Sequence, residues 1–292
     1  MSAEAITIDR TDARGLRRRG RPGTAAVYRW ELRKLVAQKR TFLGVGAAVA
    51  VPLIFTIALL ADSDGGPEGV PFGEYVRESG LAIPLVCLFF GAIWLLPLIT
   101  ALVAGDIVAA EDHNGTLKTI LTRSVERWQV FAGKLLAALT YTLAVLTAYV
   151  GVGMVAGGLV YGFEPLTSLS GTTVGVGRAI VLTAAGTLTY ALPLTAMASI
   201  AVLLSTITRN SAAAVVGTLM VSIMLQILGA ISALDFLDPY LLSTQFNAWQ
   251  GLLREPIDWA PVVRAAWVSA MYGVPAAAWA FAAFVRRDVT GG

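Results

Sequence analysis

The strongest constraint on the fold is a set of six long apolar runs. They occupy residues 42–61, 81–105, 135–161, 179–205, 212–234 and 263–285. About 20 apolar residues in a helix cross the roughly 30 Å hydrocarbon core of a bilayer, and each run reaches that length. Charged residues make up only 14% of the chain, against about 25% in soluble domains. The sequence therefore predicts an all-α polytopic membrane protein whose six transmembrane helices lie within residues 42–285.

The distribution of positive charge predicts the orientation of these helices. With the N-terminus inside, 18 of the 22 Lys and Arg residues fall on the inner side, and basic residues collect on the cytoplasmic side of membranes. Both termini are therefore expected in the cytoplasm, with residues 1–24 as a disordered basic segment and residues 286–292 as a short tail. Arginine outnumbers lysine 18 to 4, which is typical of a GC-rich bacterial genome, so the predicted location is a bacterial plasma membrane.

Residues 25–41 have the pattern of an amphipathic helix. Tyr28, Leu32 and Leu35 are spaced i, i+4 and i+7, and such a helix is expected to lie in the membrane interface. The residues predicted to form this interfacial helix surface are Tyr28, Trp30, Glu31, Arg33 and Lys34. Anionic lipid headgroups are the expected partner of the basic N-terminal region, and nucleic acid is not, because a membrane lies next to it.

Residues 106–134 form the longest polar stretch between apolar runs, and they are predicted to be cytoplasmic. Asn114-Gly115 is a turn signal, and Leu117 and Leu121 then lie on one face of a short helix. Ser124 is a candidate N-cap for a second helix that continues into the next span. The loop is therefore expected to contain two short amphipathic elements. The alternative is a solvated connector on the membrane surface.

Residues 235–262 are predicted to be an extracellular segment rich in aromatic residues and proline. Its aromatic residues are Phe236, Tyr240, Phe246, Trp249 and Trp259. Such residues favour the interface between membrane and water. Two arrangements are open, namely packing on the surface of the bundle or a short re-entrant or surface helix that covers its outer mouth.

Charged groups are expected to be absent from the interior of the spans. Asp106, Arg178 and Arg264 lie at span ends, whereas proton-coupled carriers use ionisable groups inside the membrane. The single histidine, His113, provides no metal cluster. Gly133-Lys134 is followed by Leu135 rather than Ser or Thr, so a phosphate-binding loop is missing. The chain is therefore expected to have no catalytic residues and no metal site, and it is not expected to be an enzyme.

The loop carries a recognisable motif. It comprises Glu111, Gly115, Thr116, Leu117, Leu121, Arg123, Arg127 and the pair Gly133-Lys134. On these residues the sequence resembles the permease subunits of type 2 (type V) ABC exporters. Residues 28–35, Tyr-Arg-Trp-Glu-Leu-Arg-Lys-Leu, are similar to the N-terminal connecting helix of that family. One departure is Ser124, where many members have proline.

The resemblance implies a complex of two permeases and two ATPases. The loop would contain a coupling helix that docks on a separate ATP-binding-cassette subunit, which supplies ATP and Mg, so this chain needs no cofactor. Glu111 would position the loop, Gly115-Thr116-Leu117 would begin the docking helix, and Leu121 would be an apolar contact. Arg123 belongs to the same loop signature, and Arg127 would be a polar tether. The substrate would be hydrophobic or amphipathic, such as a drug, antibiotic, peptide or lipid-like molecule.

Two other classes of function are compatible with the residues. A membrane scaffold or assembly module would need the six spans but no transport. An ion-driven carrier would need a polar site inside the bundle, for which Gln226, Tyr141 and Tyr190 are the candidates. The second permease copy could be identical, giving a homodimer, or different, giving a heterodimer.

Overall fold

The protein is described by a computed structural model that covers residues 23–61, 67–113 and 125–286. Six helical segments in these ranges are long and apolar enough to cross a membrane. They are α3 (Lys39–Ala61), the broken helix α4–η2–α5 (Ala82–Phe90, Gly91–Leu95 and Leu96–Ala104), α8 (Arg127–Tyr161), α9 (Val176–Thr208), α10 (Ser211–Gly229) and α12 (Ala260–Val285). The chain is therefore a multi-pass membrane protein, as predicted.

Short elements connect the spans. They are α2 (Thr24–Val36), η1 (Gly73–Tyr75), α6 (Ala109–His113), η3 (Ser232–Tyr240), α11 (Leu242–Gln245) and η4 (Ala248–Leu253). The only strands in the described ranges are β1 (Leu166–Thr167) and β2 (Thr173–Val174), which form an antiparallel hairpin with Leu166 opposite Val174.

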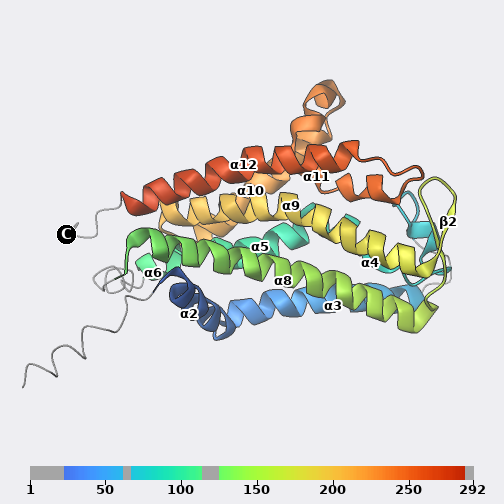
Figure 1. Ribbon diagram of the computed structural model, residues 1–292, viewed down its shortest axis with the longest axis horizontal. Coiled ribbons are helices and arrows are strands. Elements are labelled where there is room, and N and C mark those ends of the chain that lie inside the picture. Colours follow the sequence, from blue (N-terminus) through green and yellow to red (C-terminus); the bar gives the residue numbers. More distant parts are fainter. Residues whose placement is uncertain (1–22, 62–66, 114–124, 287–292) are drawn as a thin grey trace, which may run out of the picture.

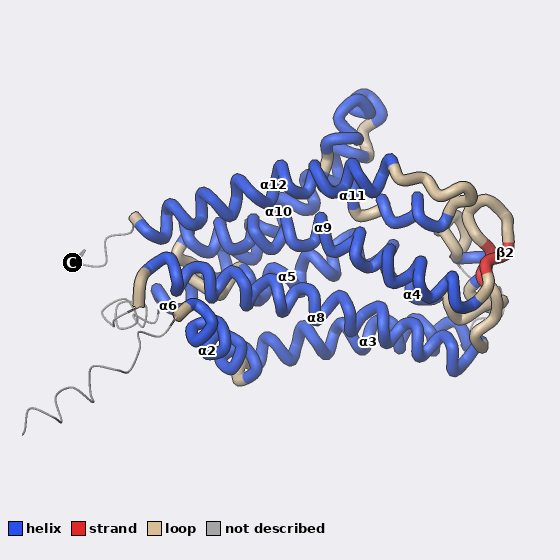
Figure 2. Tube along the Cα trace, in the orientation of Figure 1, coloured by secondary structure: helices blue, strands red, loops and turns tan. Residues whose placement is uncertain are grey.

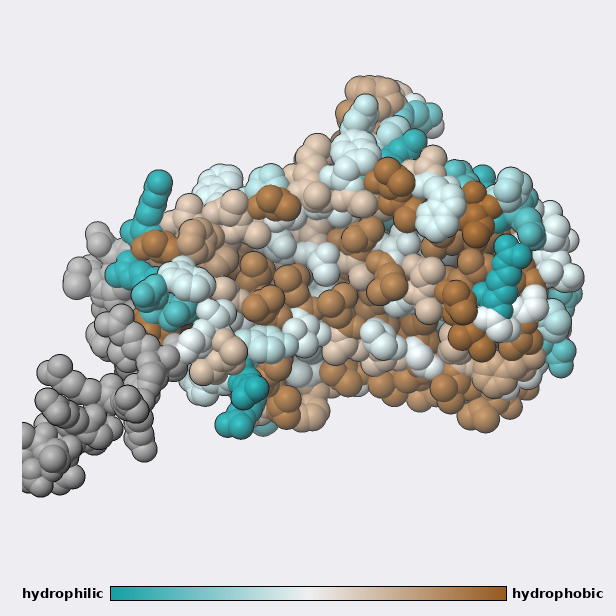
Figure 3. All heavy atoms as spheres, viewed as in Figure 1, coloured by the Kyte–Doolittle hydropathy of each residue, from teal (hydrophilic) through white to brown (hydrophobic). Residues whose placement is uncertain are grey.

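The spanning helices run along the long axis of the molecule (Figure 1). α2, α6 and the last turn of α12 lie at one end, which we call the α6 end, and the β1–β2 hairpin lies at the other, the hairpin end (Figures 1 and 2). On the face shown in Figure 3, hydrophobic residues fill most of the middle and hydrophilic residues gather toward the two ends. This distribution suits a bundle that crosses a bilayer along its long axis.

The observed boundaries differ from the predicted ones at two spans. α8 begins at Arg127 rather than near residue 135, and its N-cap is Glu126, which forms a capping box with Gln129, rather than Ser124. The sequence placed the apolar run from residue 135 but also predicted a helix, capped at Ser124, that continues into it, and the capping box starts that helix two residues later. α10 ends at Gly229, five residues before the predicted end of its span.

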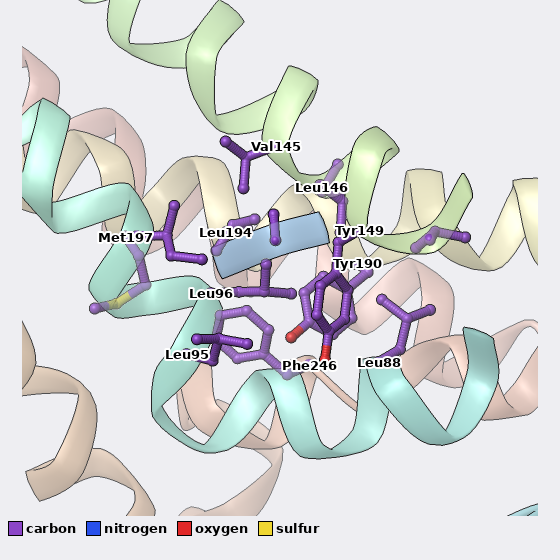
Figure 4. Packing of buried hydrophobic residues seen from close by; sticks show 14 of the residues in the cluster. Leu88, Leu95, Leu96, Val145, Leu146, Tyr149, Tyr190, Leu194, Met197 and Phe246 are labelled. Carbon is purple, nitrogen blue, oxygen red and sulfur yellow. The ribbon is translucent and has the colours of Figure 1, made fainter. Parts of the chain in front are cut away.

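The interior of the bundle is apolar and closely packed (Figure 4). Tyr149 of α8 donates a hydrogen bond to the Cys87 carbonyl over 2.8 Å, and the rings of Tyr190 and Phe246 lie 5.1 Å apart. A Cβ atom on Gly157 would overlap the Gly80 carbonyl oxygen. Glycine at position 157 therefore allows the segment that leads into α4 to approach α8 closely.

Residues 235–262 are divided between the interior and the surface. Phe246 and Trp249 are buried, while Phe236, Tyr240 and Trp259 are exposed. The buried part includes η4, which packs against α9 and α12. Surface packing therefore describes η3 but not η4, because the indole ring of Trp249 is enclosed in the core.

Candidate functional site

The candidate site is built around residues 106–113, which we call the α6 junction. This segment joins the second span to the loop that the sequence predicts to be a coupling element. Ser205 of α9 accepts hydrogen bonds from the backbone N–H groups of Val108 and Ala109 over 3.2 and 3.0 Å. The first N–H groups of a helix have no partner inside the helix. Ser205 therefore supplies the N-terminal hydrogen bonds of α6 from a different helix.

Beside α6 lies a group of four charged side chains that we call the charged cluster. Its members are Glu31 and Lys34 from α2, Glu111 from α6 and Lys134 from α8. The Lys134 ammonium lies 2.8 Å from the Glu31 carboxylate and 2.6 Å from the Glu111 carboxylate. It also donates to the Ile107 carbonyl over 3.1 Å. Lys34 pairs with the other oxygen of Glu111.

The charged cluster is balanced and almost fully enclosed. The side chains of Lys134, Glu31 and Glu111 are 0%, 1% and 3% exposed, and only Lys34, at 28%, reaches solvent. Two carboxylates face two ammonium groups, so the formal charges cancel. Removing one member of a buried ion pair leaves an uncompensated charge that costs about 3–5 kcal/mol. The four groups therefore hold α2, α6 and α8 together as one unit.

A glycine makes this contact possible. A Cβ atom on Gly133 would lie 2.7 Å from the Cγ1 atom of Val27, so α2 could not pack as closely against α8 with any larger residue at position 133. Val27 and Glu31 are one turn apart on the buried face of α2. The close approach at Gly133 brings the Glu31 carboxylate within reach of Lys134, the next residue along α8.

The position of Lys134 along α8 explains how the helix tolerates it. α8 has 35 residues and is about 50 Å long, whereas the hydrocarbon core needs only about 20 residues. Lys134 is the eighth residue of α8, about 10 Å from its start. The helix is long enough for the charged cluster to lie at the edge of the hydrocarbon rather than at its centre.

A second polar group links the α6 junction to two further helices. The Asp106 carboxylate, 3% exposed, lies 2.5 Å from an Arg40 guanidinium nitrogen at the start of α3. Ser211, the first residue of α10, also donates a hydrogen bond to Asp106. Arg40 in turn donates to the Ser211 hydroxyl over 3.3 Å. This triad joins α3 and α10 to the start of the junction.

Two weaker links complete this end of the bundle. Asp112 and Arg209 form an ion pair of 3.8 Å in which Arg209 is 62% exposed, so the pair adds little stability. Arg127 donates to the Val285 carbonyl at the end of α12 over 2.8 Å. The α6 junction therefore contacts α2, α3, α8, α9 and α10, and α8 in turn contacts the end of α12.

Comparison with known proteins identifies the family. A family model described as "Protein of unknown function (DUF2705)" matches residues 52–290. The chain belongs to that family. A search of curated proteins finds no match. The matched region includes the α6 junction and all of α8, α9, α10 and α12, whereas α2 precedes it.

Two of the seven predicted coupling residues can be placed. Glu111 is in the charged cluster and Arg127 is at the start of α8. The others, Gly115, Thr116, Leu117, Leu121 and Arg123, lie outside the described residues. In the described ranges there is no group of three or more His, Cys, Asp or Glu residues that could hold a metal ion.

The helix predicted over residues 25–41 is in fact two helices. α2 ends at Val36 and α3 begins at Lys39. Trp30 and Arg33 are exposed, while Tyr28 is partly buried and its hydroxyl hydrogen-bonds to Thr140 over 2.8 Å. Glu31 is the exception to the predicted pattern, because it lies on the face of α2 that packs against α8.

Lys134 and Glu111 lie near the ends of helical segments that are long and apolar enough to span a membrane, and both side chains are buried. The sequence analysis assigned Lys134 to the loop because it precedes the apolar run, so its burial was missed.

Proposed function

We propose that this protein is the permease subunit of an ATP-binding-cassette exporter in a bacterial plasma membrane. In this proposal the α6 end faces the cytoplasm, and the segment between α6 and α8 docks on a separate ATPase subunit. A second permease copy completes the transport path. The described chain supplies the membrane-crossing part, and the energy comes from ATP hydrolysed by its partner.

The observation that carries the proposal is the set of contacts made by the α6 junction. Glu111 links it to α2 and α8, Asp106 to α3 and α10, and Ser205 to α9. Side chains in a closely packed interior move together rather than independently. A displacement of the loop that follows α6 would therefore reach most of the bundle at once. A loop that only connects two spans through solvent would not need buried ion pairs at the α6 junction that precedes it.

The proposed cargo is hydrophobic or amphipathic. The described spans carry exposed apolar side chains along their length, including Ile57 on α3 and Met224 on α10. Surfaces of this kind suit molecules that partition into a bilayer, such as a drug, a peptide antibiotic or a lipid. A strongly charged solute would find few partners away from the two ends of the bundle.

The test begins with the tagged protein purified in mild detergent. We expect an ATP-binding-cassette ATPase to co-purify, and ATP hydrolysis in proteoliposomes to be stimulated by transported compounds. Gly115→Pro in the loop and Glu111→Gln in the junction should reduce the stimulation. Glu74→Gln, an exposed glutamate at the hairpin end, is the matched control and should leave it unchanged. Absence of a co-purifying ATPase together with full transport by Gly115→Pro would contradict the proposal.

The buried charged cluster also favours a second candidate, an ion-driven carrier. Ionisable groups inside membrane helices are typical of proton relays. Such a carrier would transport its substrate in proteoliposomes with a proton gradient and no ATPase, and Lys134→Met would abolish that transport. An exporter permease alone would transport nothing under the same gradient.

A further inference from the structure

The second span is interrupted by a π-helical turn near its midpoint. This turn is η2, Gly91–Leu95, which separates α4 from α5. The Leu96 N–H donates to the carbonyl of Gly91, five residues earlier, as the π-helical register requires. Ile93, in the middle of η2, lies midway between the first residue of α4 and the last residue of α5. Such turns inside α-helices are rare, and they occur frequently at functional sites.

Proline at position 97 explains why the helix is broken here. Pro97 is the second residue of α5, and it has no N–H. It therefore cannot donate to Ile93, four residues earlier in the α-helical register, or to Ala92, five residues earlier in the π-helical register. Its ring also clashes with the carbonyl four residues before it. A carbonyl without a partner is strongly unfavourable in hydrocarbon, so a donor from another helix would stabilise this turn.

Gln226 of α10 is that donor. Its side-chain amide nitrogen donates to the Ile93 carbonyl, and it also donates to the Ala92 carbonyl over 3.5 Å. These are the two carbonyls that Pro97 cannot serve. A side-chain amide carries two N–H groups, so one glutamine has enough donors for both. Gln226 therefore takes the place, from a different helix, of the backbone N–H that Pro97 lacks.

α10 is attached to the second span at two points. Its first residue, Ser211, donates a hydrogen bond to Asp106 at the α6 junction. Helical rise gives about 22 Å from Ser211 to Gln226 along α10, and about 20 Å from Asp106 back to Ile93 along the second span. The two contacts are therefore in register along two adjacent antiparallel helices. The contact at Asp106 involves a charged group, and the contact at Ile93 is a neutral hydrogen bond, which is the weaker kind.

We propose that η2 is a hinge in the second span and that Gln226 is the latch that holds this hinge against α10. While the amide bonds the two carbonyls, the middle of the second span stays beside α10. When the amide leaves, η2 moves away from α10, and Ser211 still holds the end of α5 through Asp106. A neutral hydrogen bond at mid-span thus sets the shape of the helix that leads to the α6 junction. The latch depends on the fold alone and requires no ATPase.

Pulsed electron paramagnetic resonance on the full chain in nanodiscs measures the position of the hinge. Spin labels are attached at Trp94→Cys in η2 and Val216→Cys in α10, both exposed positions, after Cys87→Ala removes the single native cysteine. With Gln226 present we expect one narrow distance between the labels. Gln226→Leu should raise the population at longer distances about tenfold, as expected for loss of a hydrogen bond. Gln226→Met, which also lacks a donor, repeats the measurement with a more flexible side chain.

A second background separates the latch from simple packing. Pro97→Ala restores the missing N–H, so Gln226→Leu should have little effect on the distance distribution when it is combined with Pro97→Ala. Gln250→Leu removes the same amide from η4, where it bonds Asn247, and as the matched control it should keep the wild-type distribution. A distribution that Gln226→Leu and Gln226→Met leave unchanged would overturn the proposal. Equal broadening by Gln226→Leu with and without Pro97→Ala would overturn it as well.

Discussion

The two ends of the bundle are held together by different kinds of contact. At the α6 end, helices are linked by buried charged side chains, with Lys134 between two carboxylates and Asp106 between Arg40 and Ser211. At the hairpin end the buried links include apolar packing and backbone hydrogen bonds, while the ion pair between Arg178 and Glu255 lies at the surface. The rings of Phe72 and Trp249 stack 6.1 Å apart, and the Gly80 N–H donates to the Gly162 carbonyl.

This difference has consequences for stability and motion. The stability of apolar packing depends on how completely the side chains fill the space between helices. Moving a helix opens a gap, and the side chains around it lose many small contacts at once. Ion pairs depend on the presence of each charged partner, and the loss of one group affects all helices that share it. The hairpin end is therefore expected to be sensitive to side-chain size, and the α6 end to side-chain charge.

The largest effect is expected for Lys134→Ala. It leaves the Glu31 and Glu111 carboxylates buried without their shared partner, and the free energy of unfolding should fall by about 5 kcal/mol, the upper end of the range for a broken buried ion pair. Titration with SDS in mixed micelles measures the change. Lys39→Ala, at an exposed lysine, is the control and should change stability little. If Lys134→Ala and Lys39→Ala lower the free energy of unfolding by similar amounts, the buried charged cluster stabilises the fold no more than an exposed lysine does.

A smaller but still large effect is expected for Trp249→Ala at the hairpin end. Removal of this fully buried indole ring should lower the free energy of unfolding by about 4 kcal/mol, because it creates a cavity in a packed core. Trp259→Ala removes the same side chain from an exposed position and should have a much weaker effect. Equal losses in the two variants, measured by the same titration, would contradict the packing described for η4.

Asp106→Asn should have an intermediate effect. It keeps the shape of the side chain but removes the charge that faces Arg40, and a hydrogen bond to a charged group contributes about 2 kcal/mol. Asp235→Asn, at an exposed aspartate in η3, should be nearly neutral. If Asp106→Asn is also neutral in thermal unfolding, the triad does not stabilise the α6 junction.

The smallest effect is expected for Arg178→Ala. Its ion pair with Glu255 spans 3.5 Å at the surface of the hairpin end, and exposed pairs contribute less than about 1 kcal/mol. Adding 1 M salt should remove most of even that contribution, since the screening length falls to about 3 Å. A loss above 2 kcal/mol that persists in high salt would show that charge also governs the hairpin end.

The sequence predicted the spans well because each apolar run is long and separated from the next by polar residues. The extension of α8 ahead of its apolar run was predicted, but its N-cap was placed at Ser124 rather than at Glu126, which forms a capping box with Gln129. The charged cluster was missed for a different reason. Glu31 and Lys134 are 103 residues apart in sequence, and no local pattern indicates that their helices cross at Gly133. Glu111 was singled out by the resemblance to exporter permeases, but its partners are seen only in the packing.

The most direct test of the central claim is hydrogen exchange on the protein in complex with the proposed ATPase subunit. The claim is that the charged cluster carries motion from the loop to the bundle. In the wild type, adding ATP should change amide exchange in α2 and in the first turns of α8. In the triple variant Glu31→Gln, Glu111→Gln and Lys134→Met the change should be confined to the loop. The same ATP-dependent change in α2 and α8 of both proteins would contradict the claim.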